Sequence, residues 1–155
     1  MKASGERISK GRAQVVDIVM PGQTNHYGTL FGGQLIAMMD KAANIAAMRY
    51  CKGDCVTVSV DNIVFEKPVK LGETVIVDAR MIYVGNTSML VRVKAESETK
   101  DGEIKIIIGC ADFVFVAVSK EGKPVQVPAP ILDGDDERRL FERGKDIKES
   151  LRRVC

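Results

Sequence analysis

The fold is decided by residues 33–50, which read GQLIAMMDKAANIAAMRY. Alanine, leucine and methionine dominate this stretch, no proline interrupts it and β-branched residues are few, so its composition favours a helix. Apolar side chains lie on nearly every side of that helix, which is typical of a buried helix. Alanines at positions 42, 43, 46 and 47 would let other elements approach it closely. We therefore expect a long central helix that the rest of the chain surrounds.

Five apolar stretches outside this helix predict β-strands. Each alternates apolar with polar residues, or is apolar throughout, and each is bounded by turn residues. Within the second stretch the apolar alternation changes phase between Val60 and Ile63, which predicts a bulge or a strand buried on both faces. Gly85-Asn86 predicts a hairpin turn. The stretches are residues 14–20, 56–65, 74–83, 88–96 and 103–118.

The alternation also assigns side chains to the faces of the sheet. In residues 74–83 it places on one face Val75, Val77, Ala79, Met81 and Tyr83. In residues 103–118 both faces are apolar, which predicts a central position for this strand in the sheet. One face there carries Ile104, Ile106 and Ile108, and the other carries Ile107, Phe113 and Phe115.

Residues 135–153 predict a final amphipathic helix, with Leu140, Ile147 and Leu151 on one side and charges elsewhere. The order of the elements predicts an α+β fold, in which one largely antiparallel sheet wraps around the central helix. The other face of the sheet is also apolar, and one narrow helical stripe cannot cover it. We therefore expect partner subunits to cover that face.

Composition and charge narrow the possible functions. The 155 residues include 23 basic and 21 acidic side chains and no tryptophan. A nucleic-acid-binding protein is usually more basic and richer in aromatic residues, so no nucleic-acid partner is expected. No run of about 18 apolar residues predicts a membrane span, and residues 1–12 lack the apolar core of a secretion signal. We expect a cytoplasmic protein with reduced cysteines. Because His26 is the only histidine, no metal site is expected.

Gly32, Gly33 and Asp40 are the strongest candidates for chemistry. Two glycines at the start of the helix leave its first backbone N–H groups unshielded, and the helix dipole adds positive potential there. Such a helix end can polarise a carbonyl group or hold an oxyanion. Asp40 stands in the middle of the helix among apolar residues, where a carboxylate is costly to bury unless it is paired. This setting favours a functional carboxylate.

The spacing of these residues predicts that two chains share the site. Asp40 follows Gly32 by eight residues, which corresponds to about 12 Å along a helix. One acyl carbonyl cannot reach both groups, because hydrogen bonding and nucleophilic attack need contacts of about 3 Å. A two-fold homodimer with antiparallel helices would bring the helix N-terminus of one subunit to Asp40 of the other, twice.

Two polar residues precede the glycines. Asn25 could orient a water molecule or a substrate oxygen, although asparagine in a glycine-rich loop is more often a turn residue. His26 could act as a general acid, but a single loop histidine is more often incidental. The chain contains neither the Gly-x-Ser-x-Gly motif of serine hydrolases nor a phosphate-binding Gly-Lys-Ser/Thr loop.

This set of residues resembles a known family. The pattern Asn25-His26-x-Gly28-x-x-Phe31-Gly32-Gly33, with Asp40 seven residues later, is similar to that of the hotdog-fold acyl-CoA thioester hydrolases, especially the short bacterial members related to brain acyl-CoA hydrolase. The resemblance covers about residues 14–130. It continues through Val58-Ser59-Val60-Asp61, Phe65-x-Lys67-Pro68-Val69, Gly72-Glu73, Gly85-x-Thr87-Ser88-Met89 and Gly122-Lys123-Pro124. It implies a hotdog acyl-CoA hydrolase domain at residues 1–130 and a helical extension at 131–155.

The resemblance also implies an activity and an assembly. The family hydrolyses acyl-CoA to fatty acid and CoA without a metal or other cofactor, and its dimers commonly assemble into hexamers. Its catalytic asparagine and aspartate fall on Asn25 and Asp40, which would act across the subunit interface. The family turn commonly reads Gly-Arg-Thr-Ser, so Asn86 stands where a cation is usual. The implied CoA contacts are Val58, Phe65, Lys67, Gly85, Asn86, Thr87 and Ser88.

Two other functions stay open at this point. A hotdog hydratase acting on acyl thioesters would use His26 and Asp40 as an acid/base pair. A non-catalytic sensor would bind acyl-CoA without consuming it, although no appended DNA-binding domain is evident. Release of free CoA distinguishes hydrolysis from both.

Overall fold

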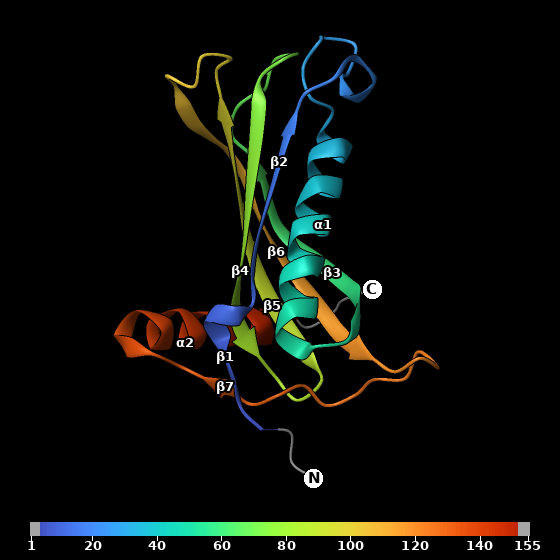
Figure 1. Cartoon of the computed structure of the whole chain (residues 1–155), viewed down its shortest axis with the longest axis vertical. Helices are drawn as coiled ribbons and strands as arrows, with labels where there is room; N and C mark the ends of the chain where they lie inside the picture. Colours follow the sequence, from blue (N-terminus) through green and yellow to red (C-terminus); the bar gives the residue numbers. More distant parts are fainter. Residues whose placement is uncertain (1–3, 152–155) are drawn as a thin grey trace.

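A single antiparallel sheet curls around one long helix (Figure 1). The computed structural model describes residues 4–151. The sheet has five strands in the order β2-β4-β5-β6-β3, and this arrangement confirms the expected hotdog fold. The strands are β2 (Arg12–Ile18), β3 (Asp54–Phe65), β4 (Thr74–Val84), β5 (Ser88–Glu98) and β6 (Lys105–Val118). The helices are α1 (Gly32–Cys51) and α2 (Gly134–Ser150). Within residues 4–151, no helix is long and apolar enough to cross a membrane.

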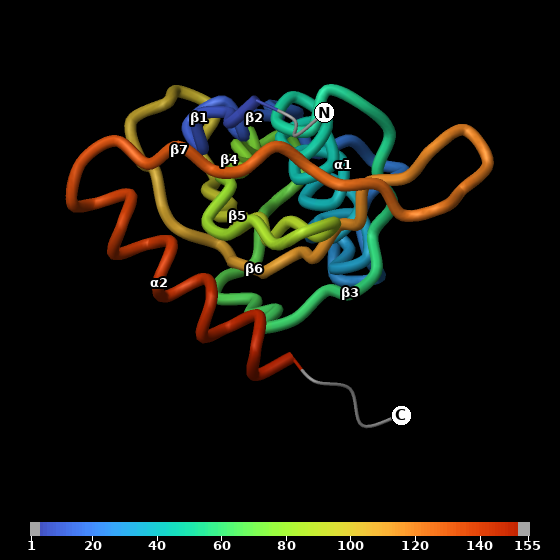
Figure 2. Tube along the Cα trace, turned by 90° about the horizontal axis from the view of Figure 1, so that it is seen from below, coloured from blue at the N-terminus to red at the C-terminus, as the bar shows by residue number. Residues whose placement is uncertain are grey.

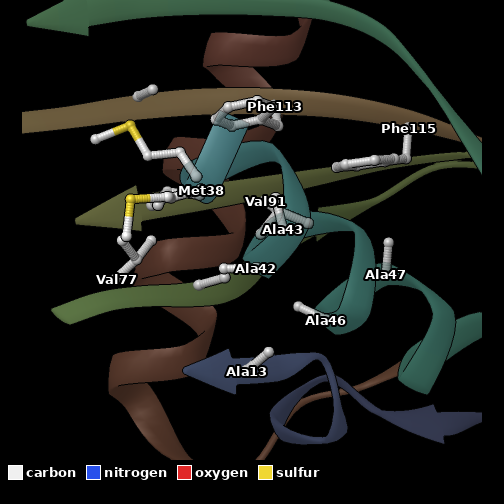
Figure 3. Close-up of a cluster of buried hydrophobic side chains, with 14 of the residues drawn as sticks. Ala13, Met38, Ala42, Ala43, Ala46, Ala47, Val77, Val91, Phe113 and Phe115 are labelled. Carbon is white, nitrogen blue, oxygen red and sulfur yellow. The ribbon is translucent and has the colours of Figure 1, made fainter. Parts of the chain in front are cut away.

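α1 packs against the sheet through its smallest side chains. Ala42, Ala43, Ala46 and Ala47 are fully buried, and Figure 3 shows them among apolar side chains of β4, β5 and β6. Since only methyl groups separate the helix backbone from the sheet there, the two can pack closely. We expected the helix to be buried on nearly every side, with a partner's helix packed beside it. One stripe of α1 is exposed, at residues 33, 34, 37, 41, 48 and 49.

A bulge in β4 overturns one predicted side-chain position. The expected inward residues at positions 75, 77, 79 and 81 are all buried in the core. Tyr83 does not follow them, because the pairing of β4 with β5 shifts between Met81 and Tyr83. The ring of Tyr83 lies instead against Phe141 of α2, with centroids 5.0 Å apart. Beyond a bulge, the residues of a strand exchange faces.

A second bulge changes the faces of β6, which occupies the expected interior position between β5 and β3. The predicted division of its faces is wrong, because Ile108 is buried in the same core as Phe113 and Phe115. Glu96 pairs with Ile107 and Ala95 with Gly109, so Ile108 is an extra residue in the ladder. The bulge expected in β3 is confirmed by shifts between Thr57 and Ser59 and between Asp61 and Val64.

α2 lies on the side of the sheet opposite α1 (Figure 2). Ile147 of α2 and Leu151, which follows its last residue, pack against outward side chains of the sheet, namely Ile82, Leu90 and Val114. The outer face is therefore covered in part by the chain's own helix, whose narrow apolar stripe was expected to be too small to cover it fully. The last residues of the predicted helix, 152 and 153, lie outside the described residues.

Gly144 sets how closely α2 approaches the sheet. A Cβ atom at this position would lie 2.8 Å from the Cβ of Tyr83 and 2.9 Å from the carbonyl oxygen of Ile82. Both are rigid sheet atoms, so Gly144→Ala is expected to displace α2 although alanine favours helix formation. Overpacking of this kind costs about 1–3 kcal/mol, or roughly 2–12 °C in thermal unfolding. Lys145→Ala, at an exposed neighbouring position, is the control. Equal or greater stability of Gly144→Ala would contradict this packing.

Two short strands join the ends of the described chain. β1 (Glu6–Arg7) pairs in parallel with β7 (Pro130–Ile131), and an ion pair of 3.2 Å connects Arg7 to Asp133. Neither two-residue strand was expected from the sequence. The division into residues 1–130 and 131–155 stays a prediction, and its boundary falls inside β7.

Candidate active site

Four of the predicted site residues line one pocket of about 290 Å³. They come from three places: the loop before α1, the first residue of α1 and the end of β3 with the turn after it. They are Asn25, Gly32, Phe65 and Lys67. The other lining residues are Thr29, Leu30, Leu35, Glu66, Pro68 and Val69. The structure thus brings the N-terminus of α1 together with the Lys-Pro corner, which are more than thirty residues apart in the sequence.

The first backbone N–H groups of α1 are available to a ligand. Phe31 occupies the N-cap position and provides no side-chain cap. The N–H groups of Gln34 and Leu35 donate to the carbonyl of Phe31. Among the described residues, no hydrogen bond occupies the N–H of Gly32 or Gly33. A Cβ at Gly33 would lie 2.6 Å from the ring of Phe31, so glycine lets this ring lie over the helix end.

Asn25 organises the loop before α1. Its side-chain oxygen accepts hydrogen bonds from the N–H groups of Tyr27 (2.9 Å) and Thr29 (3.2 Å), and its amide nitrogen donates to the Thr29 hydroxyl (3.0 Å). This is the turn geometry that asparagine commonly adopts. The same side chain lines the pocket, so one residue shapes the loop and faces the space beside the helix N-terminus.

Asp40 lies apart from that pocket and contacts β3. The hydroxyl of Thr57 donates a 2.7 Å hydrogen bond to Oδ1 of Asp40, and the carboxylate is half-buried. Sequence reasoning missed Thr57. Its only signal is a hydroxyl residue within the apolar run of β3, and its meaning depends on the register of that strand against α1.

The remaining predicted residues lie outside the pocket. His26 is exposed, and its ring lies against that of Tyr27, with centroids 4.0 Å apart and the ring planes tilted by 41°. Val58 is 47% exposed on β3. The turn at residues 85–88 closes the β4–β5 hairpin through a hydrogen bond from the Gly85 N–H to the Ser88 carbonyl. That confirms the expected hairpin, but the turn shares no residue with the pocket of Asn25.

β3 forms one open edge of the sheet. It pairs with β6 on one side, and no described strand lies on its other side. Its exposed apolar residues are Val56, Val58, Ile63, Val64 and Phe65. Asp40 therefore lies beside a strand whose outer backbone groups are free to pair with another chain.

Two cysteines lie close to this region. A hydrogen bond between the thiols of Cys51 and Cys55 lowers the pKa of Cys51 to about 7. The same bond, together with burial, raises the pKa of Cys55. Cys55 also contacts the side-chain oxygen of Asn44 at 3.7 Å. Cys51 is thus the more reactive thiol toward alkylating and disulfide reagents at neutral pH.

The sequence is similar to those of known thioester hydrolases. Residues 27–103 match a family described as the thioesterase superfamily. The chain is 40% identical over 124 residues to an uncharacterized acyl-CoA thioester hydrolase of Zymomonas mobilis, covering 76% of this chain and 79% of that protein. It is 31% identical over 140 residues to the cytosolic acyl coenzyme A thioester hydrolase of Rattus norvegicus, covering 89% of this chain. The match spans only 37% of the length of the rat protein.

Solved structures are also similar. The acyl-CoA hydrolase of Staphylococcus aureus, in complex with butyryl coenzyme A, coenzyme A and coenzyme A disulfide, has a TM-score of 0.83 and 30% identity over 95% of this chain and 92% of that one. Further structures of that hydrolase carry alanine in place of an asparagine, an aspartate and a threonine, in that order along its chain and separated by 15 and 17 positions. An apo-hexameric acyl-CoA thioesterase has a TM-score of 0.86 and 28% identity, covering 97% of this chain and 99% of that one.

Proposed function

The chain belongs to the acyl-CoA thioester hydrolases of the thioesterase superfamily, and from this we propose that it hydrolyses acyl-CoA to a carboxylic acid and free CoA. Water supplies the oxygen of the new carboxyl group, and the C–S bond of the thioester breaks. The chain matches only part of the length of the mammalian relatives. Its acyl-CoA substrate and its assembly with other copies are therefore proposed here as well. A cytoplasmic location is likewise proposed, supported by the cytosolic name of the rat relative.

The hydrogen bond between Thr57 and Asp40 at the open edge of β3 carries the proposal. The free N–H groups of Gly32 and Gly33 lie at the start of α1, and Gly32 is eight residues or about 12 Å before Asp40. Asn25 lies in the loop before α1 and lines the pocket beside these groups. A second copy added along β3, with its α1 antiparallel, would bring its helix N-terminus to Asp40. Each dimer would then contain two sites, and each site would use both chains.

The Staphylococcus aureus variants support these residue assignments. The asparagine, aspartate and threonine replaced in that hydrolase are separated by 15 and 17 positions. Asn25, Asp40 and Thr57 have the same order and the same separations in this chain. Because three residue types match at the same spacings, we infer that Asn25, Asp40 and Thr57 occupy the positions of the three replaced residues. This adds Thr57 to Asn25 and Asp40, the pair expected from the sequence.

Each of these groups has a role in the proposed reaction. The N–H of Gly33, with that of Gly32, would polarise the thioester carbonyl and stabilise the oxyanion. Asp40 of the other subunit would act as general base on water, or as nucleophile through an anhydride that water then cleaves. Asn25 would position the carbonyl or the water. Thr57 would hold one carboxylate oxygen of Asp40, which leaves the other oxygen for the reaction.

The CoA portion would extend from the pocket over β3. Lys67 lines the pocket and provides a cation near the Lys-Pro corner. Phe65 and Val58 present exposed apolar surface on β3. In the proposed dimer the 85–88 turn would complete the CoA contacts. No metal or other cofactor takes part in this proposed mechanism.

The assembly is proposed as a dimer that forms a hexamer, the state named for one similar thioesterase. Joining two β3 edges would cover the exposed apolar residues of that strand. Light scattering tests this: a stable active monomer near 17.0 kDa would overturn the shared site, and a stable active dimer would overturn only the hexamer.

Release of free CoA tests the activity. Purified protein is mixed with acyl-CoA substrates of increasing chain length, and CoA is detected with a thiol reagent. The half-buried free cysteines Cys51 and Cys110 must first be titrated or replaced by serine, because their thiols react with the same reagent. Time-dependent CoA release at every enzyme concentration supports hydrolysis. Substrate binding without CoA release would favour the sensor instead.

Thr57 is expected to act as a positioning residue. Thr57→Val keeps the shape of the side chain and removes its bond to Asp40, and a hydrogen bond to a charged group contributes about 1.5–3 kcal/mol. We expect kcat to fall roughly 10- to 100-fold with little change in KM. Thr57→Ser should restore most of the rate. A loss that serine does not rescue, or one confined to KM, would contradict this role.

A further inference from the structure

A larger pocket lies away from the candidate active site. It has a volume of about 570 Å³ and is formed by β2, β4 and β5, with Arg49 of α1 and Leu140 of α2 at its borders. It shares no lining residue with the pocket of Asn25. Its volume is within the range of pockets that hold small ligands. Nothing in the proposed hydrolysis uses it.

The pocket is unusually cationic. Five of its lining residues are basic, and one is acidic. The basic residues are Arg12, Arg49, Arg80, Arg92 and Lys94, and the acidic residue is Asp78. Of the apolar lining residues, Ala13, Ala79 and Ile82 are buried, and Leu140 is half-buried.

Three of these arginines stand directly opposite one another on neighbouring strands. Arg12 of β2 pairs in register with Arg80 of β4, and Arg80 pairs with Arg92 of β5. Like charges in this position repel and destabilise a sheet. The protein therefore holds a row of guanidinium groups along one wall of a cavity at a cost to its own stability, and a bound anion would offset that cost.

The protein's own carboxylates neutralise only part of this row. Arg92 forms two hydrogen bonds to Asp112, of 2.9 and 3.0 Å, and Lys94 pairs with Glu96 at 2.9 Å. Asp78 accepts a hydrogen bond from Gln14. Within residues 4–151, Arg12, Arg49 and Arg80 form no ion pair, although Arg49 donates to the carbonyl of Arg12.

We propose that this pocket, which we call the arginine pocket, binds a small ligand that carries two or more phosphate groups. Arginine is the side chain whose planar fork best matches phosphate oxygens. Two adjacent unpaired guanidinium groups favour a diphosphate over a single phosphate. The half-buried side chain of Leu140 beside them provides an apolar contact for the organic part of such a ligand. The arginine pocket shares no residue with the proposed catalytic site, so ligand binding there can be tested independently of hydrolysis.

Titration calorimetry of the full-length protein in phosphate-free buffer tests the proposal. The probes are inorganic pyrophosphate, ADP, CoA and orthophosphate. We expect saturable binding of pyrophosphate and ADP, with orthophosphate weaker. Arg80→Gln should weaken pyrophosphate binding by about tenfold or more, because it removes charge-assisted hydrogen bonds. Lys120→Gln, which removes an exposed cation on the turn after β6, should bind as the wild type does.

The stability of the free protein provides a second readout. Because Arg80 faces two like charges, Arg80→Gln should unfold at the same or a higher temperature than the wild type, while the stabilisation by pyrophosphate is lost. If Arg80→Gln does not fold, Arg12→Gln at an exposed position replaces it.

Three results would overturn the proposal. The first is the absence of saturable binding by both pyrophosphate and ADP. The second is equal pyrophosphate affinity in wild type and Arg80→Gln, including the case in which the variant changes only the oligomeric state and so marks a subunit contact. The third is binding of CoA alone, insensitive to Arg80→Gln and weakened by Lys67→Gln, which would assign the phosphates to the active site.

Discussion

Replacing Asp40 with asparagine is expected to lower the turnover of acyl-CoA by at least about 100-fold, the usual scale for loss of a positioned base. Asparagine has the same shape and can still accept the hydrogen bond from Thr57, so the fold and the β3 contact should be kept. The reaction loses the negative charge that activates water or attacks the carbonyl. Steady-state CoA release, with folding checked by circular dichroism, measures the effect.

The control is Asp136→Asn, which removes an exposed carboxylate on α2 and should leave turnover unchanged. Turnover within threefold of wild type in a folded Asp40→Asn protein would remove Asp40 from the mechanism. Mixing Asn25→Ala and Asp40→Asn subunits tests the shared site separately. One of the two sites in each mixed dimer would be wild type, so activity should return in part on mixing. Mixtures as inactive as their components would refute a site built from two chains.

Replacing Asp112 with alanine is expected to destabilise the fold by about 3–5 kcal/mol, because it leaves a charged partner without its counter-ion. Asp112 is 2% exposed on β6. It accepts two hydrogen bonds from Arg92 and one of 3.0 Å from Asn62. For a protein of this size, such a loss lowers the unfolding temperature by roughly 6–20 °C. Thermal unfolding at a fixed protein concentration measures it.

A double replacement separates the ion pair from general packing. Removing both charges, as in Arg92→Leu with Asp112→Leu, should cost less than Asp112→Ala alone, because the partly exposed Arg92 guanidinium is then no longer left without its carboxylate. If the effects of the two replacements add, the double variant will be less stable than either single variant. That result would mean that Asp112 contributes by packing rather than by its pair with Arg92.

The fold was largely predictable because its strongest signal is local. The central helix follows from the composition of residues 33–50, and the observed helix begins one residue earlier and ends one residue later. The faces of β4 and β6 were not predictable beyond their bulges. An extra residue such as Ile108 is fixed by its pairing with β5, and a single strand's alternation does not contain that information.

The site was predictable where one element carries it. Gly32, Gly33 and Asp40 share α1, so a helical rise alone gives their separation. Thr57 acquires its meaning only when β3 is placed against α1. The arginine pocket could not be predicted from the sequence, because Arg12 and Arg80 come together only through the pairing of β2 with β4.

The open edge of β3 makes the behaviour of the protein depend on its concentration. Its unpaired backbone groups and exposed apolar residues, Phe65 among them at 52% exposure, are the features from which aggregates grow. The exposed β3 edge of a newly folded chain can therefore either pair in register with the β3 edge of a second copy or join a disordered aggregate. Both encounters need two chains, so dilution slows both, but it also raises the fraction of chains whose edge is unpaired. Activity should therefore fall on dilution and return when the protein is concentrated again.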